Sequence, residues 1–142
     1  MQIVNSRERT LIDLMDKTIK ENPGYDGYVC LQVNSPLRTK QHVEEAIQVF
    51  EHSRCDYLYS VTREHHFLWD HECEPIIYEN ANRQDRPCYY KANGAIFIFR
   101  SLERRTFEPY IMDAWESIDV HDETDMAVCE HLMWKKMIAS SG

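Results

Sequence analysis

The chain has 142 residues, of which 43% are hydrophobic and 28% are charged, and its formal net charge is −8. This length suits one domain with a real core, and the composition is that of a globular protein rather than a disordered one. The negative charge argues against a nucleic-acid surface, because phosphate contacts need clustered Lys and Arg, but it is compatible with a divalent-cation site. No apolar run approaches the roughly 20 residues that span a bilayer, and no signal-peptide pattern opens the chain. We therefore expect a cytoplasmic protein with no nucleic-acid or membrane partner.

The first half of the chain alternates helical and extended patterns. Thr10 to Lys20 has apolar residues at helical spacing, and Asn22-Pro23-Gly24 should end that helix. Tyr28 to Gln32 reads as a strand, and a helix capped by Thr39 should follow it. The apolar face of that second helix would consist of Val43, Ala46, Ile47 and Phe50. With a strand at Tyr57 to Thr62, the order predicts a right-handed βαβ unit with parallel strands.

The second half begins with an irregular segment, residues 63–91, which is rich in aromatic and charged residues. Such a long excursion inside one domain is usually functional or an interface, so we expect a projecting hairpin there, with short strands at residues 69–70 and 76–78. Asn93-Gly94 should turn the chain into a central buried strand, Ala95 to Phe99. Shorter elements are expected at residues 101–105, 110–112 and 117–120. A last helix, Thr124 to Ile138, should have an apolar side made of Met126, Val128, Cys129, Leu132, Met133 and Trp134.

Glycine and cysteine usage restricts the chemistry. The four glycines form no glycine-rich phosphate-binding loop. The five cysteines are odd in number and scattered, which favours reduced thiols. No cysteine lies in a recognisable Cys/His context for a nucleophile. His65, His66, His71 and Cys73 crowd one loop, but their spacing matches no structural zinc pattern, so a polar loop or dimer packing is the simpler interpretation.

Three groups of polar residues are candidates for binding. Residues 31–39, LQVNSPLRT, pass from a strand into a polar turn, which is either an ordinary turn or a ligand-binding rim carrying Gln32, Asn34, Ser35 and Arg38. Residues 119–125 contain acidic side chains that could hold Mg²⁺ or stabilise a helix N-terminus. Residues 83–86, RQDR, are either a solvated loop or a patch for carboxylate or phosphate recognition.

Four stretches together resemble the acylneuraminate cytidylyltransferases, also called CMP-sialic acid synthetases. LQVNSPLRT is similar to the family segment LQPTSPLRT. The later family blocks, in the same order, resemble residues 60–70 (SVTREHHFLWD), 83–99 (RQDRPCYYKANGAIFIF) and 117–130 (SIDVHDETDMAVCE). The similarity covers nearly the whole chain, and the segments are specific in combination.

The resemblance implies a Rossmann-like α/β fold of the nucleotide-diphospho-sugar transferase type, with three α/β/α layers. Residues 1–142 would form a single domain corresponding to the C-terminal two thirds of the family domain, with residues 63–91 as a dimerisation hairpin and a homodimer as the assembly. It also implies a reaction in which CTP and Mg²⁺ join CMP to a nine-carbon α-keto acid sugar, releasing pyrophosphate. The implied metal ligands are Asp119 and His121, and the implied substrate-binding residues are Gln32, Ser35, Arg38, Arg83, Gln84, Lys91 and Asn93.

Three departures from the family pattern shape what we expect. The chain has no counterpart of the ARGGSKG-type loop that cradles the CTP phosphates, so we expect an N-terminally truncated domain that is inactive as this chain alone. His121 replaces the second aspartate of the metal motif and is a poorer Mg²⁺ ligand. Val33-Asn34 replaces Pro-Thr. The alternatives are a non-catalytic sugar-binding module and a dimerisation domain derived from the same family.

Overall fold

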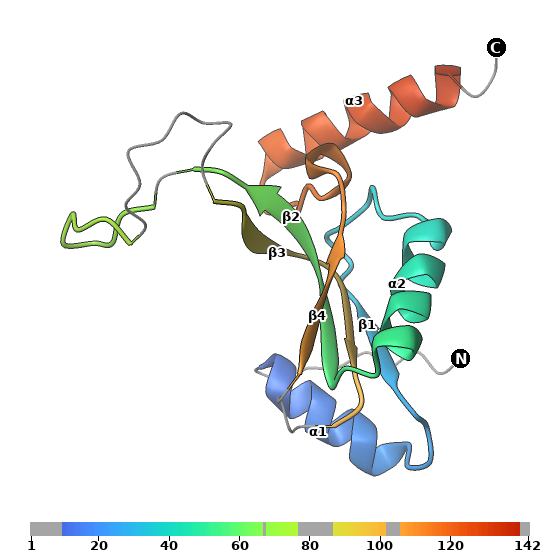
Figure 1. Ribbon diagram of the computed structural model, residues 1–142. Coiled ribbons are helices and arrows are strands. Elements are labelled where there is room, and N and C mark those ends of the chain that lie inside the picture. Colours follow the sequence, from blue (N-terminus) through green and yellow to red (C-terminus); the bar gives the residue numbers. More distant parts are fainter. Residues whose placement is uncertain (1–9, 67, 77–86, 102–105, 140–142) are drawn as a thin grey trace.

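The computed structural model describes residues 10–66, 68–76, 87–101 and 106–139. Eight elements follow one another: α1 (Leu11–Glu21), β1 (Tyr28–Leu31), α2 (Lys40–Ser53), β2 (Tyr57–Glu64), β3 (Tyr89–Phe99), β4 (Phe107–Ile111), the 3-10 helix η2 (Ala114–Glu116) and α3 (Glu123–Ala139). The strands form one open sheet in the order β1-β3-β2-β4. Its twist and the flanking helices are visible in Figure 1.

The sheet is mixed. β3 pairs antiparallel with both β1 and β2, whereas β4 pairs parallel with β2. β1 and β2 therefore run in the same direction, as expected for strands joined through α2, but they are not neighbours. The apolar run Ala95 to Phe99 of β3 lies between them. Both faces of this part of β3 are buried, as a continuously apolar run requires.

α1 and α2 cover opposite faces of the sheet, as Figure 1 shows. On one face, Met15 of α1 packs with Phe97 and Phe99. On the other, Ala46 and Phe50 of α2 belong to a cluster with strand residues that include Leu58, Ile96 and Ile98. Side chains alternate between the two faces of β3, so one strand serves both cores. The α/β class and the two-sided covering of the sheet agree with the sequence, while the Rossmann-like topology stays a prediction.

Local signals account for where the helices begin and end. Thr10 and Thr39 cap α1 and α2 by accepting hydrogen bonds from the main-chain N–H groups of Asp13 and His42. The Thr39 N–H in turn donates to His42 Nδ1, which completes a capping box. Arg54, at the end of α2, takes the left-handed conformation with φ 55°.

The structure corrects the expected turn at Asn93-Gly94. Both residues lie inside β3, which runs for 11 residues, and the pairing with β2 shifts register between Tyr59 and Val61. The extra β3 residues bulge at this point, and Gly94 has φ +72°, a conformation that suits glycine. An Asn-Gly pair inside an apolar pattern therefore marked a bulge here rather than a hairpin turn.

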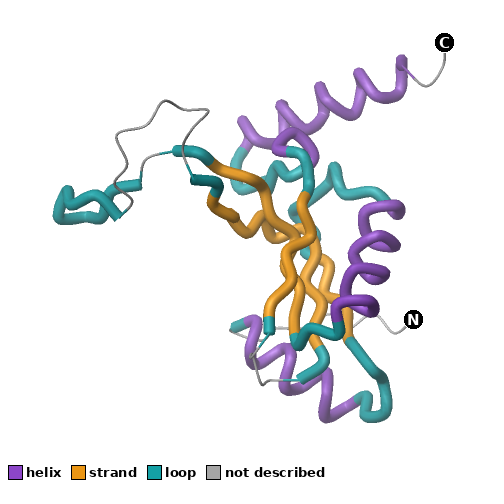
Figure 2. The backbone as a smooth tube through the Cα atoms, viewed as in Figure 1, coloured by secondary structure: helices purple, strands orange, loops and turns teal. Residues whose placement is uncertain are grey.

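The C-terminal helix forms where it was expected, but its apolar side is not buried. Only Cys129 is buried in α3, whereas most of the expected apolar residues are exposed, including Met126, Val128, Met133 and Trp134. α3 extends beyond the end of the sheet in Figures 1 and 2, so it has no strand face to cover. Residues 117–120, expected to be extended, form no strand in the described chain.

β2 runs to Glu64 and β3 begins at Tyr89, so both ends of the expected excursion belong to strands, and its described part at residues 68–76 lies away from the sheet (Figure 2). Its described part contains a tight reversal, in which Trp69 and Pro75 form an isolated antiparallel bridge and Asp70 accepts hydrogen bonds from the N–H groups of Glu72 and Glu74. The expected strand at residues 76–78 and the expected helix at residues 101–105 lie largely outside the described residues. A hairpin is thus present at residues 68–76, and its role in dimerisation stays a prediction.

Candidate functional site

The residues predicted to bind ligands gather partly at one end of the sheet, where β1 ends and β3 bulges. Gln32 follows β1 directly, and its Oε1 lies 2.7 Å from the position that a Cβ on Gly94 would occupy. The same Cβ position is 3.8 Å from Oδ2 of Asp119. Gln32, Gly94 and Asp119 are therefore neighbours. The close approach depends on Gly94 having no side chain.

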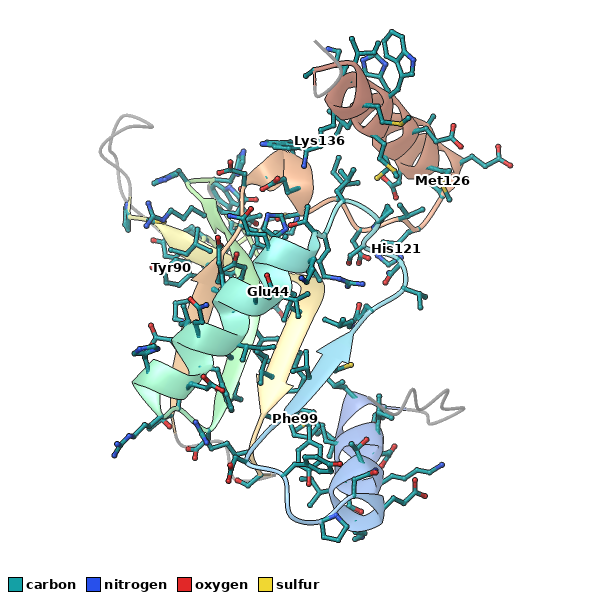
Figure 3. The ribbon with its side chains drawn as sticks, turned by 90° about the vertical axis from the view of Figure 1, so that its right-hand side faces the viewer. Glu44, Tyr90, Phe99, His121, Met126 and Lys136 are labelled. Atoms are coloured by element: carbon teal, nitrogen blue, oxygen red, sulfur yellow. The ribbon has the colours of Figure 1, made fainter. Side chains whose placement is uncertain are left out.

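A backbone contact holds the two loops of this region together. The N–H of Val120 donates to the carbonyl oxygen of Asn34 over 2.8 Å, which joins the turn after β1 to the segment before α3. His121 lies at this junction, near the start of α3, as Figure 3 shows. Two segments far apart in the sequence, residues 32–35 and 119–121, thus lie together, and their joint role in binding stays a prediction.

Two polar atoms in this region are buried without a partner. Among the described residues, Ser35 Oγ and Asp119 Oδ1 are the buried side-chain oxygen or nitrogen atoms that make no hydrogen bond. A buried polar group without a partner costs about 1–3 kcal/mol, so such atoms call for an explanation such as a bound ligand, ion or water. Both belong to residues that the sequence predicted for binding.

Asp119 and His121 are a pair. Asp119 Oδ2 lies 2.8 Å from His121 Nε2, and His121 is mostly exposed. In the described part of the chain no three His, Cys, Asp or Glu side chains converge as a metal-ion site. Mg²⁺ needs only one or two protein carboxylates when waters and phosphates complete its shell. Asp119 Oδ1 fits one such ligand, whereas His121 is engaged with the other oxygen of Asp119.

Arg38 ties the site to the sheet. Its Nη1 donates to the carbonyl oxygens of Gln32 and Ala95, over 2.9 and 2.6 Å. Burial lowers the pKa of Arg38 from its ordinary value, and it raises the pKa of the neighbouring Cys30 thiol, which the arginine partly offsets. These contacts hold the end of β1 against β3, and a substrate contact by Arg38 stays a prediction.

Asn93 has an internal role. Its Oδ1 accepts hydrogen bonds from Ser60 Oγ at 2.5 Å and from the N–H of Ala95 at 3.2 Å. Its Nδ2 donates to Ser117 Oγ over 2.8 Å. The side chain therefore fixes the bulge and links it to the segment that carries Asp119. Ser60, Gly94 and Ser117 were not predicted for this region, although a glycine inside a strand pattern is a recognised sign of a bulge or a close approach.

The remaining predicted residues lie elsewhere or outside the described chain. Lys91 is exposed on β3 beyond the bulge and is paired with Thr62 of β2. Arg83 and Gln84 lie outside the described residues. Their predicted contacts with substrate stay predictions.

The architecture defines an α/β protein with a mixed, open sheet and a polar site at the end of β1. No protein-family model matches the chain. It is 24% identical over 143 residues to an N-acylneuraminate cytidylyltransferase of Oncorhynchus mykiss. The alignment covers 89% of this chain and 33% of that protein. It is 25% identical over 147 residues to N-acylneuraminate cytidylyltransferase B of Danio rerio, covering 89% of this chain and 34% of that protein.

These similarities establish a distant relationship to the N-acylneuraminate cytidylyltransferases. The chain spans about a third of the length of the two relatives. No helix in the described part of the chain is long and apolar enough to cross a membrane.

Proposed function

We propose that this chain is the sugar-facing part of a cytidylyltransferase, which transfers CMP from CTP to a nine-carbon α-keto acid sugar and releases pyrophosphate. The observation that carries the proposal is the meeting of Gln32, Gly94 and Asp119 at one end of the sheet, together with two buried oxygen atoms, Ser35 Oγ and Asp119 Oδ1, that lack partners. The relationship to N-acylneuraminate cytidylyltransferases supplies the reaction class.

In this proposal the chain contributes positioning rather than a nucleophile. The Gln32 amide, which has both donors and an acceptor, would bind sugar hydroxyl groups, and Ser35 would add a further hydrogen bond. Arg83 and Gln84 would bind the sugar carboxylate, and Lys91 the negative charge of the substrates. Holding the sugar in place is a large share of the catalytic task, because orienting two reactants removes much of the entropic barrier.

We assign Asp119 as the protein ligand of Mg²⁺ in this proposal. Its Oδ1 is buried and unpartnered, and a carboxylate oxygen is the donor that Mg²⁺ prefers. His121 would orient Asp119 through their 2.8 Å contact rather than replace a carboxylate ligand. When bound, the metal would neutralise phosphate charge.

Because the chain has no glycine-rich loop, we propose that it performs no CMP transfer by itself. In keeping with the family, we further propose that it works in the cytoplasm as part of a homodimer whose contacts include the hairpin at residues 68–76.

Titration calorimetry with N-acetylneuraminate and with CTP, each alone, tests the sugar-facing site. We expect the wild-type chain to bind the sugar and Gln32→Ala to weaken that binding at least tenfold. Gln48→Ala, an exposed residue on α2, is the matched control and should bind as the wild type does. Failure of the wild-type chain to bind any sugar of this type would overturn the site. Binding without any CTP affinity would favour the non-catalytic sugar module.

Two further measurements address the metal and the reaction. In Mg²⁺ titrations with CTP present, Asp119→Asn should lose the metal dependence of nucleotide binding, while Asp122→Asn should keep it. Asp122 makes a good control because its side chain caps α3 by accepting from the N–H of Asp125, a role that asparagine retains. Steady pyrophosphate release from CTP and sugar by this chain alone would contradict the proposed inactivity.

A further inference from the structure

The two loops of the candidate site are joined by a side-chain contact as well as by their backbone hydrogen bond. One loop, residues 32–39, leads from β1 into α2, and the other, residues 113–121, leads from β4 toward α3 and contains η2. The side-chain contact runs from His42, in the first turn of α2, to Glu116 of η2, with 3.2 Å between His42 Nε2 and Glu116 Oε2.

Each ring nitrogen of His42 has its own partner. The N–H of Thr39 donates to Nδ1 over 3.2 Å, so Nδ1 acts as an acceptor. The ring proton therefore lies on Nε2, which faces the Glu116 carboxylate. The His42 side chain is only 13% exposed. The ring is thus enclosed by the protein and bonded on both sides.

Glu116 has a partner on each carboxylate oxygen. Its Oε2 faces His42, and its Oε1 lies 3.1 Å from Nζ of Lys136, which belongs to α3 (Figure 3). The Lys136 ammonium group also lies over the Trp115 ring at 4.2 Å. A carboxylate that is 15% exposed needs such partners, because burying an unpaired charge is costly. Glu116 therefore connects α2, η2 and α3 at one point.

We propose that His42 and Glu116 are positioning residues of the candidate site, and we call the contacts of His42 with Thr39 and Glu116 the brace. His42 comes three residues after Thr39, where the first loop ends, and Glu116 comes three residues before Asp119. The brace therefore fixes the separation of the loops that carry Ser35 and Asp119. Binding groups must be held in place to orient a substrate. The effect on substrate rests on the proposed function, whereas the brace itself does not.

Two substitutions of His42 separate the brace from the helix cap. Glutamate and glutamine are both standard at the third helical position of a capping box, so each keeps an acceptor for the Thr39 N–H. Glutamine also has an N–H group to face Glu116, whereas glutamate places a second carboxylate against it. His42→Glu thus breaks the contact with Glu116, and His42→Gln keeps it. His52→Glu, at an exposed histidine of the same helix, is the matched control for the added charge.

Hydrogen exchange followed by mass spectrometry tests the brace without any ligand. His42→Glu should raise the exchange rate of the N–H groups in residues 113–121 at least tenfold, because that loop loses its contact with α2. The apolar run of β3, Ala95 to Phe99, should exchange as in the wild type, which shows that the variant is folded. His42→Gln and His52→Glu should match the wild type throughout.

A second variant guards against loss of the fold. If the β3 run also exchanges faster in His42→Glu, Glu116→Gln takes its place, since it weakens the same contacts without adding a charge and should also raise exchange at residues 113–121. Unchanged exchange there, or an equal rise in His42→Gln or His52→Glu, would overturn the brace.

Titration calorimetry with N-acetylneuraminate tests the effect on the site. His42→Glu should raise the dissociation constant at least fivefold, and His42→Gln should stay within twofold of the wild type. Faster loop exchange with unchanged sugar affinity would overturn the positioning role. Absence of sugar binding by the wild-type chain would instead refute the proposed function, and the exchange rates would then decide the brace by themselves.

Discussion

The residue that most directly couples the fold to the candidate site is Asn93. Its amide joins Ser60 of β2, the backbone of β3 at Ala95, and Ser117, two residues before Asp119. Ser60 Oγ in turn accepts from the N–H of Ile96, and its single hydroxyl proton faces both Asn93 Oδ1 at 2.5 Å and the Ile96 carbonyl oxygen at 3.1 Å. The Asn93 side chain thus links β2, β3 and the segment that carries Asp119.

We expect Asn93→Ala to lower the free energy of unfolding by about 2–3 kcal/mol, because it leaves several buried polar groups without partners. Urea denaturation measures this loss. Asn34→Ala is the control, since Asn34 joins the network of the site through its carbonyl oxygen, which the substitution keeps. Equal stabilities of Asn93→Ala and Asn34→Ala would show that the network contributes little.

Tyr110 and Glu45 form a second residue-scale link, between β4 and α2. The Tyr110 hydroxyl donates to Glu45 Oε2 over 2.6 Å, and this bond, followed by one from Gln41, lowers the pKa of Glu45 from its ordinary value of 4.5. Burial and the Glu45 carboxylate raise the pKa of Tyr110 well above its ordinary value of 10, so the hydroxyl stays protonated at neutral pH.

The direction of the Glu45 pKa shift predicts how the stability of the fold depends on pH. A carboxyl with a lowered folded-state pKa stabilises the fold above its unfolded pKa and loses that contribution as the pH falls through the folded pKa. Tyr110→Phe should therefore be less stable than the wild type at pH 7, and the difference should narrow below about pH 4. Urea denaturation at pH 7 and pH 3.5 measures this, with the exposed Tyr25→Phe as control. A difference that is constant with pH would rule out the ionic contribution.

At the scale of elements, α1 and α3 differ in how they use their apolar residues. α1 packs Met15, which is 0% exposed, against Phe97 and Phe99 on one face of the sheet. Figure 3 shows Phe99 at the end of β3 beside α1. The contacts of α3 with the rest of the chain include Lys136, which pairs with Glu116 at 3.1 Å and lies over the Trp115 ring at 4.2 Å.

Two methionine substitutions separate these cases. Met15→Ala should cost about 2–5 kcal/mol of stability, because it leaves a cavity in a closed core. Met126→Ala on α3, where the side chain is 48% exposed, should change stability by less than about 0.5 kcal/mol. Thermal and urea unfolding of both variants would test this. A large loss for Met126→Ala would mean that another surface covers α3 in solution.

At the scale of the whole molecule, the sheet has two different edges. β4 carries Pro109, whereas β1 is apolar and lies beside a groove. The candidate site lies at the other end of β1, where Gln32 follows the strand. Arg38 links this end of β1 to β3, because its guanidinium donates to the carbonyl oxygens of Gln32 and Ala95.

Much of the local structure could be predicted from residue patterns. The cap at Thr39, the apolar face of α2 and the buried run of β3 depend on neighbours within a few residues, and they form where they were expected. The approach of Gln32 to Asp119 beside Gly94 depends on tertiary packing rather than on any local pattern, and the binding roles that the family resemblance implied for these residues stay predictions. Arg83 and Gln84 lie beyond what the described residues can test.

The sequence by itself determined the class of the protein, the positions of its helices and its distant relationship to the cytidylyltransferases. Only the tertiary structure decided that β3 separates β1 from β2, that Asn93-Gly94 is a bulge, and that most apolar residues of α3 stay exposed. The physical reason is that each of these depends on what a segment packs against. The spacing of apolar residues predicts which side of a helix or strand tends to be buried. Whether that side is buried depends on a surface formed by residues far away in the chain.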